Sequence, residues 1–193
     1  MSIPWNNHKS TLNFLAIYAP NNERASEDLW RDVKTYYDDK AIPKKPHFVL
    51  GDFNLVEDEI DRRPAHRDDT GAVDTLKAML RALRMQDGFR KEYPDRCAFT
   101  WGLNHSPDSI PPNASLSRID RIYCRRDMYF STREWRIHLD HTVGTDHELV
   151  SATYYNLDAP FIGKGRWQIP GFLLDCADFM EQVNDLCALA IAK

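Results

Sequence analysis

The spacing of apolar residues predicts two amphipathic helices in the first half of the chain. From Glu23 to about Lys40, apolar side chains recur every three or four residues, and Asn22 is a suitable cap for the first turn. The same spacing runs from Val73 to Arg84. Each helix therefore has one apolar stripe that must pack against another element.

Short apolar runs around these helices predict β-strands, because aromatic and β-branched residues are frequent in them. The predicted strands lie at residues 12–18, 47–50, 99–101, 119–123 and 149–155. Strands that alternate with helices are typical of an α/β domain. The polar segment at 57–71, which contains a proline, predicts a surface loop.

The composition changes after Asp158, where the domain is expected to end. Proline and glycine are frequent up to Gly171, as in a linker. Residues 172–191 then have helical spacing with a broad apolar face. We therefore divide the chain into a domain at 1–157 and, at 158–193, a linker followed by an amphipathic helix.

Length and composition narrow the class of protein. The 193 residues, 42% of them hydrophobic and 28% charged, suit one globular domain plus a tail. No apolar run reaches the roughly 20 residues that span a bilayer, and the first residues lack the pattern of a signal peptide. We therefore expect an intracellular protein that contacts no membrane. The four cysteines form no CxxC pair, which favours reduced thiols over a zinc site.

The charge distribution gives a mixed indication about nucleic acids. The net charge of −4 lacks the basic surplus of most nucleic-acid-binding domains. Arginines are nevertheless concentrated between residues 118 and 136, and acids between residues 52 and 74. An acidic metal site facing a basic rim that binds phosphate would give this distribution. Two unrelated charged surfaces, each exposed to solvent, would give the same charge distribution.

Two short motifs at strand ends carry candidate chemistry. Gly51-Asp52-Phe53-Asn54 follows one apolar run, and Gly144-Thr145-Asp146-His147 precedes another. Hydrolysis of a phosphodiester requires an activated water, a divalent cation and stabilised negative charge, which carboxylates, an amide and an imidazole can provide. His147 is a candidate acid, base or cation, and Asp120 is a candidate carboxylate that fixes its tautomer.

Each candidate also has a plain structural interpretation. Glycine beside Asp or Asn is common in turns, and an Asp-His pair in a loop is often incidental. Tyr18, at the end of a predicted strand, could be a core residue with a satisfied hydroxyl. Asp120 could pair with Arg118 or Arg121. The functional interpretation is favoured because these positions all fall at strand ends of one α/β domain.

Four motifs occur in the order that is typical of one known superfamily. They are Tyr18-Ala19-Pro20-Asn21, Gly51-Asp52-Phe53-Asn54, Ser117-Arg118-Ile119-Asp120 and Thr145-Asp146-His147. From about Leu12 to Tyr154 the chain thus resembles the endonuclease/exonuclease/phosphatase superfamily. This resemblance implies a fold like that of deoxyribonuclease I, a four-layer α/β arrangement in which a two-sheet β-sandwich is flanked by helices.

Tyr18 narrows the resemblance within the superfamily. Apurinic endonucleases and the endonuclease domain of LINE-type retrotransposons have a tyrosine at this position, whereas deoxyribonuclease I and the inositol phosphatases have a histidine. The tail adds to the similarity, because residues 163–167 and the helix after them resemble the connector that leads to a reverse transcriptase in some retroelements.

The resemblance also implies roles and a cofactor. The expected catalytic residues are Tyr18, Asp52, Asn54, Asp120 and His147. The expected contacts with substrate are Asn21, Thr100, Trp101 and Arg118, and Asp146 is expected to lie near the metal. The implied ion is Mg²⁺, with Mn²⁺ able to substitute, held by hard oxygen ligands. DNA is the implied partner, which is compatible with a nuclear location.

The sequence departs from the family pattern at its N-terminus. Family members have two further strands and a helix before the tyrosine motif, and these carry an Asn and a metal-binding Glu. Residues 1–11 contain no acid. Glu57 and Glu59 lie in a predicted loop and are poor replacements. We therefore expect an N-terminally truncated domain that lacks several strands, with weakened metal affinity and turnover, and an unpaired sheet edge that favours association.

Three hypotheses about function follow. The first is a metal-dependent endonuclease that hydrolyses DNA, weakened by truncation. The second is a catalytically inactive remnant or a fragment that binds nucleic acid or a partner. The third is a phosphatase of the same superfamily, against which Tyr18 argues.

Overall fold

The computed structural model describes residues 1–5, 10–39, 44–102, 111, 113–139, 145–155 and 177–191, and the side chains of the last segment as far as residue 185. The chain forms two compact units, at Met1–Leu157 and Asp158–Lys193. The first unit contains all the candidate site residues.

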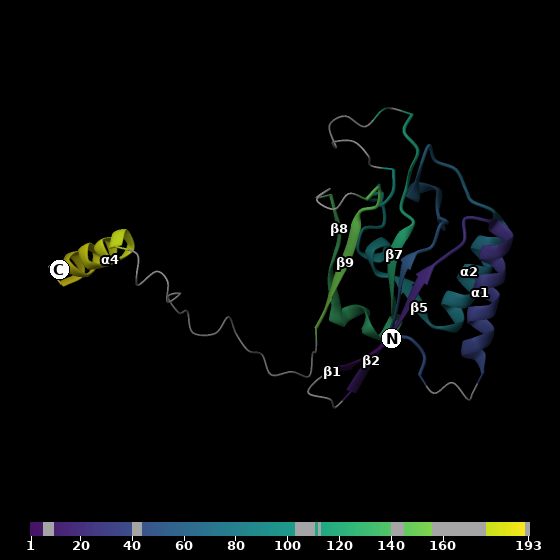
Figure 1. Ribbon diagram of the computed structural model, residues 1–193, viewed down its shortest axis with the longest axis horizontal. Helices are drawn as coiled ribbons and strands as arrows, with labels where there is room; N and C mark the ends of the chain where they lie inside the picture. The colour runs from purple at the N-terminus through teal and green to yellow at the C-terminus, as the bar shows by residue number, and fades with distance from the viewer. Residues whose placement is uncertain are drawn as a thin grey trace. The chain divides into compact units, whose positions relative to one another are not determined.

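A mixed five-stranded sheet lies at the centre of the first unit (Figure 1). In spatial order its strands are β1 (Ser2–Trp5), β2 (Ser10–Tyr18), β3 (Phe48–Asp52), β7 (Asp120–Arg125) and β5 (Met85–Asp87). Strands β2 and β3 are parallel, and the other neighbours are antiparallel. A parallel pair needs a crossover connection, and the helix between β2 and β3 in the sequence provides it.

Helices α1 (Glu23–Asp38) and α2 (Thr70–Ala82) cover one face of this sheet (Figure 1). Asn22 caps α1 and Asp69 caps α2, because each side chain accepts a hydrogen bond from a backbone N–H in the first turn. The apolar stripes of both helices are buried in a core with the sheet. This core includes Trp30, Val49, Phe53, Leu76, Met79 and Tyr123. Both predicted helices are confirmed, with small shifts at their ends.

A two-stranded antiparallel ribbon, made of β8 (Thr132–His138) and β9 (Leu149–Tyr154), packs against the opposite face of the central sheet. The alternation along β3 demonstrates this arrangement, since Val49 belongs to the helix-side core whereas its neighbour Phe48 belongs to the ribbon-side core. The ribbon side also buries Trp135. The expected α/β sandwich of sheets flanked by helices is confirmed.

The short helix α3 (Gly88–Glu92) joins the ribbon side of the sandwich through Phe89. Its first residue must be glycine, because a Cβ at Gly88 would lie 2.0 Å from Cζ2 of Trp135. The 3-10 segment η3 (Arg126–Ser131) then connects β7 to β8. The apolar pattern does not predict β1, β5 or β8, which are short or mostly polar.

The expected surface loop at 57–71 is instead partly structured and partly buried. It contains the 3-10 turn η1 (Glu59–Asp61) and the short strand β4 (Arg62–Arg63). Strand β4 pairs with β6 (Leu116–Ser117), which directly precedes the segment that carries Asp120. The loop is therefore part of the framework beneath the site.

Asp61 lies at the centre of a buried cluster of charges. Arg118 donates to both of its carboxylate oxygens, from Nε and Nη2, at 2.7 Å each, and Nη2 also lies 2.7 Å from Oδ2 of Asp87. Arg90 donates to the same carboxylate of Asp61. Asp61 and Arg118 are 1% and 2% exposed. This cluster ties η1 to the segment before β7 and to the start of α3.

The C-terminal unit contains helix α4 (Ala177–Ile191). The sequence predicts that this helix begins at residue 172, but residues 172–176 lie outside the described residues. The predicted linker also lies outside them, and so do residues 163–167, which resemble a retroelement connector. Within the described part of the chain, no helix is both long and apolar enough to cross a bilayer.

We predict that Asp61→Ala lowers the free energy of unfolding by about 3–5 kcal/mol, because it leaves buried guanidinium groups without their carboxylate. Burial opposes ionisation, but the hydrogen bonds and charge of Arg118 hold the pKa of Asp61 below its ordinary value. The contribution of Asp61 to stability should therefore be present at neutral pH and be lost as the pH falls through this lowered pKa. Urea unfolding at several pH values measures both effects.

The matched control is Asp28→Ala, which removes an exposed carboxylate paired with Arg31 on α1. Its expected effect is below about 1 kcal/mol. Similar losses of stability in the two variants would contradict the importance assigned to the buried cluster.

Candidate functional site

The register of the central sheet brings three candidate residues to one end of neighbouring strands. Tyr18 is the last residue of β2, Asp52 the last of β3 and Asp120 the first of β7. Tyr18 is the register partner of Asp52, which in turn is the partner of Asp120. Register partners on neighbouring strands present their side chains on the same face of a sheet. Residues distant in the sequence therefore form a row.

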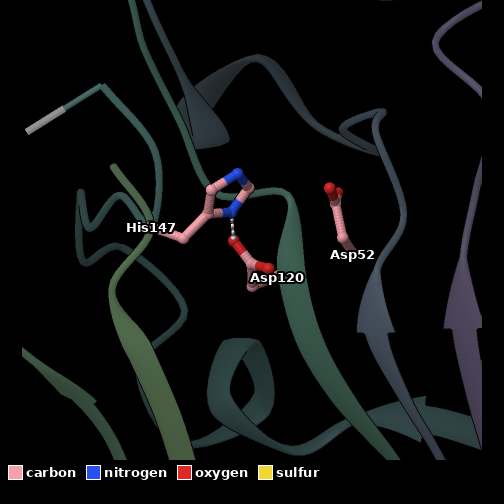
Figure 2. Close-up of side chains that lie close together, drawn as sticks. All are labelled: Asp52, Asp120 and His147. Atoms are coloured by element: carbon pink, nitrogen blue, oxygen red, sulfur yellow. Dashed lines mark hydrogen bonds and ion pairs between the residues drawn. The ribbon is translucent and has the colours of Figure 1, made fainter. Parts of the chain in front are cut away.

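His147 completes the site from the segment before β9. Its Nδ1 lies 2.9 Å from Oδ2 of Asp120, which is the contact that we expected between these two residues. Figure 2 shows the imidazole ring above Asp120, with Asp52 on the adjacent strand and facing the same space. One ligand atom each from Asp52, Asp120 and His147 lies within 4.8 Å of the other two.

The pKa values of Asp52 and His147 are both perturbed. Burial, together with the nearby charge of Asp120, raises the pKa of Asp52 above its ordinary value, although the backbone N–H of Asn54 opposes this. Burial disfavours the charged form of His147, but the hydrogen bond to Asp120 and the surrounding carboxylates outweigh it and raise the pKa. The site therefore favours a protonated imidazole between carboxylates.

The turn after β3 fixes the backbone next to Asp52. Gly51 has φ +134°, and a Cβ there would lie 2.0 Å from the carbonyl oxygen of Ile17, so that glycine is required. Asn54 adopts the left-handed conformation with φ +49°. Its backbone N–H donates to Oδ1 of Asp52 at 2.8 Å, and its Nδ2 donates to the carbonyl of Ala19 at 2.7 Å. The two motifs that carry Tyr18 and Asp52 are thus joined by Asn54.

Asn21 and Asn54 line a cleft of about 260 Å³ beside this turn. Arg62 also lines it, and its guanidinium lies 2.5 Å from Asp68 and 2.9 Å from Oγ of Ser117. No sequence motif marks Arg62 as a candidate, because the segment that carries it has the composition of a polar loop. Tyr18 is 80% exposed, which excludes the interpretation as a core residue.

Trp101 and Asp146 are in direct contact. The Nε1 of Trp101 donates to Oδ2 of Asp146 at 3.0 Å, and Oδ1 of Asp146 lies 4.0 Å from Nε2 of His147. The side chain of Asp146 is 55% exposed, so it is accessible to a cation or a solvent molecule. Trp101 also forms an isolated β-bridge with His147, which orders this edge of the site.

Two of the expected substrate contacts do not fit the structure. Thr100 is fully buried, and its hydroxyl accepts hydrogen bonds from the backbone N–H groups of Ile119 and Asp120. Arg118 is committed to Asp61 and Asp87 in the buried charge cluster. Both residues lie near Asp120 in the structure, but their buried side chains are unavailable to substrate.

The expected basic rim is reduced for the same reason. Arg121 is 1% exposed and donates to the carbonyl of Leu55 and to the hydroxyl of Tyr123. Glu57, considered as a replacement metal ligand, accepts the hydroxyl hydrogen bond of Tyr123 at 2.5 Å. These groups stabilise the framework around Asp52, and the sequence carries no signal for their pairing because the partners are distant along the chain.

The residues present fit a divalent cation. Asp52 and Asp120 are directly opposed carboxylates on neighbouring strands, and their mutual repulsion contributes to the raised pKa of Asp52. A cation between them would remove this repulsion. Carboxylate oxygens suit both Mg²⁺ and Mn²⁺.

The sandwich and the arrangement of its strands define the class of protein, an α/β domain with the deoxyribonuclease I-like fold. Residues 5–148 match the Endonuclease/Exonuclease/phosphatase family, and the chain therefore belongs to this family. Members of the family generally use divalent metals. A comparison with curated protein sequences found no match.

Solved structures with the same fold include nucleases and a phosphatase. A 3′-5′ exonuclease (NExo) from Neisseria meningitidis is 19% identical with a TM-score of 0.61, and the match covers 75% of this chain and 61% of that one. An AP endonuclease from Archaeoglobus fulgidus is 16% identical with a TM-score of 0.58, covering 74% of this chain and 61% of that one. The chain thus spans about three fifths of their length.

The endonuclease domain of TRAS1, a telomere-specific non-LTR retrotransposon, has the same fold. It is 16% identical with a TM-score of 0.52, and the match covers 78% of this chain and 58% of that domain. A further Neisseria structure, described as the 3′ phosphatase NExo, contains a product DNA hairpin. The expected superfamily and its fold are confirmed by these comparisons together with the family match.

We predict that Asp120→Asn lowers the pKa of His147, because it removes the carboxylate that favours the imidazolium form. In the unmodified protein, the stabilisation from this pair should be present below the pKa of an unfolded histidine and be lost as the pH rises through the raised pKa. NMR titration of the metal-free protein and variant measures the change.

His47 provides an internal control for this titration. Its Nδ1 accepts a hydrogen bond from the backbone N–H of Asn13 at 2.8 Å, and burial lowers its pKa. It precedes β3 at the end of the strand opposite to Asp52. Its titration should be the same in both proteins, and an unchanged pKa of His147 in Asp120→Asn would contradict the pairing.

Proposed function

We propose that this chain hydrolyses phosphodiester bonds in DNA with the help of a divalent cation, as an endonuclease. The observation that supports this most is the convergence of Asp52, Asp120 and His147, whose ligand atoms lie within 4.8 Å of one another at the end of the central sheet. Half-buried carboxylates beside an imidazole with a raised pKa are typical of sites that transfer protons. The family match and the nuclease folds among the solved structures support the same class of reaction.

His147 and Asp120 act together in the proposed reaction. Asp120 occupies Nδ1 of His147, which leaves Nε2 as the ring atom that faces a substrate phosphate. Burial opposes the charged form, but the hydrogen bond and charge of Asp120 raise the pKa of His147 and so favour a protonated imidazole, whose Nε2 donates a hydrogen bond to a non-bridging phosphate oxygen. Negative charge on that oxygen increases in the transition state, which this donor stabilises.

Asp52 accepts a proton from the attacking water in the proposed reaction. Its half-buried carboxylate ends β3 beside His147, and the backbone N–H of Asn54 fixes the orientation of this carboxylate. The side chains of Tyr18, Asn21 and Asn54 then provide hydrogen-bond donors for the remaining phosphate oxygens. Tyr18 is well placed for this because its exposed ring ends the strand next to Asp52.

The cation that we propose is Mg²⁺, with Mn²⁺ as a substitute. Asp52 and Asp120 would hold it, with Asp146 close to the departing oxygen. When bound, it supplies positive charge that neutralises the phosphate and the leaving group. A DNA substrate implies action in a compartment that contains DNA, for which the nucleus is our proposal, and the retroelement resemblance suggests an original connection to a reverse transcriptase.

We predict that the protein nicks supercoiled DNA, or DNA with an abasic site, in the presence of Mg²⁺ or Mn²⁺. His147→Ala and Asp52→Asn should each lower the rate by about 10²–10⁴-fold, because each removes a group that transfers or donates a proton. Gel analysis of open-circular product measures the rate. The control is His66→Ala, because His66 is exposed and contacts only the carbonyl of Pro64 among its described polar contacts.

The outcomes of this assay separate the hypotheses. Salt-sensitive DNA binding without cleavage with either metal would contradict the nuclease hypothesis and support a fragment that only binds nucleic acid. Hydrolysis of a terminal phosphate or of phosphoinositides without nicking would replace it by a phosphatase. Equal rates for His147→Ala and His66→Ala would remove His147 from the mechanism.

We also predict that Asp52→Asn weakens binding of Mn²⁺ by at least about tenfold, which is about 1.4 kcal/mol. Binding to the unmodified protein should weaken as the pH falls through the raised pKa of Asp52, because a protonated carboxylate is a poor ligand. Isothermal titration calorimetry measures both effects. Asp28→Asn on α1 is the control, and the same affinity in both variants would exclude Asp52 as a ligand.

A further inference from the structure

Thr100 lies between the two segments that carry the catalytic pair. It is fully buried, and its Oγ1 accepts hydrogen bonds from the backbone N–H groups of Ile119 and Asp120, at 3.1 Å and 2.9 Å. The carbonyl oxygen of the same residue accepts from the backbone N–H of Glu148 at 2.7 Å. One residue therefore binds the backbone at Asp120 and the backbone immediately after His147.

The backbone around Thr100 strengthens this connection. The N–H groups of Thr100 and Trp101 both donate to the carbonyl of Ser117, at 2.8 Å and 2.9 Å. Trp101 also forms isolated β-bridges with Ser117 on one side and His147 on the other. Thr100 and Trp101 thus link two segments that are distant in the sequence.

The hydroxyl has a role that the backbone contacts cannot replace. Asp120 is the first residue of β7, and its N–H is directed at the hydroxyl of Thr100. A valine at position 100 would have nearly the same shape but would leave two buried N–H groups without an acceptor. Buried donors without partners are costly, so the segment from Ile119 to Asp120 would shift until other acceptors or water satisfied them.

We propose that Thr100 is a positioning residue that sets the distance between Asp120 and His147 through its hydroxyl and its carbonyl oxygen. The hydroxyl fixes the backbone position of Asp120 at the start of β7, and the carbonyl oxygen fixes the backbone of the segment that carries His147. Thr100 touches no substrate, because its side chain is fully buried. Its consequence for catalysis rests on the function proposed above, whereas its effect on the contact between His147 and Asp120 does not.

The experiment compares Thr100→Val, which removes the hydroxyl, with Thr100→Ser, which retains it. The first readout is the NMR signal of the imidazole N–H at Nδ1 of His147, which the hydrogen bond to Asp120 protects from exchange. We expect this signal in the unmodified protein and in Thr100→Ser, and its loss in Thr100→Val. The second readout is DNA cleavage, for which we expect kcat to fall by about one to two orders of magnitude in Thr100→Val with little change in KM.

Thr132→Val is the matched control. Thr132 is 2% exposed, and its hydroxyl donates to the carbonyl of Met128 at 2.9 Å, so this variant also removes a buried hydroxyl hydrogen bond. Thr132 pairs with Tyr154, at the end of β9 that lies away from His147. Thr132→Val should retain the imidazole signal. If the signal is lost in Thr132→Val as well as in Thr100→Val, the loss reflects a general decrease in stability, and the proposal is overturned.

Retention of the signal in Thr100→Val would overturn the proposal directly. If that variant fails to fold, hydrogen exchange of the unmodified protein tests the proposal instead. Slow exchange of the N–H groups of Ile119 and Asp120 supports the proposal, and fast exchange overturns it. A protein that has the imidazole signal but cleaves no DNA would contradict the proposed function and leave the positioning role of Thr100 intact.

Discussion

The antiparallel register between β3 and β7 is the constraint on which the site depends. It places Asp52 directly opposite Asp120, so that two carboxylates face one another at the end of the sheet. Such a pair is unfavourable by itself, because like charges repel. The imidazole of His147 offsets part of this repulsion through its contact with Asp120. The proposed chemistry depends on the remaining unbalanced charge, which attracts a cation.

Buried polar contacts behind the strands maintain this register. Asp61 and Arg118 anchor the segment that enters β7, whereas Arg121 binds the carbonyl of Leu55 after the turn of β3. Thr100 anchors the backbone of Asp120 from the other side. Unpaired charges and donors would be costly in these positions, so the folded state favours the complete set of contacts. The exposed site therefore rests on a framework that is itself highly polar.

The candidate site was largely accessible from the sequence, and the framework was not. Tyr18, Asp52 and Asp120 each lie at the end of an apolar run, and such ends are recognisable from local composition. Thr100 and Arg118 have equally suitable chemistry for binding a phosphate, and no local pattern argues against either residue. Only their burial against distant partners removes them from contact with substrate.

The sequence alone determined the class of fold, helices α1 and α2 with the cap of the first, and the order of the motifs, because helix periodicity and capping act within a few residues. It did not determine the strands β1, β5 and β8, whose stability comes from neighbours rather than from their own composition. Tertiary structure decided which polar side chains face solvent and which are buried in pairs. The reason is that burial and charge pairing depend on contacts between segments that are far apart in the chain, as between Asp61 and Arg118.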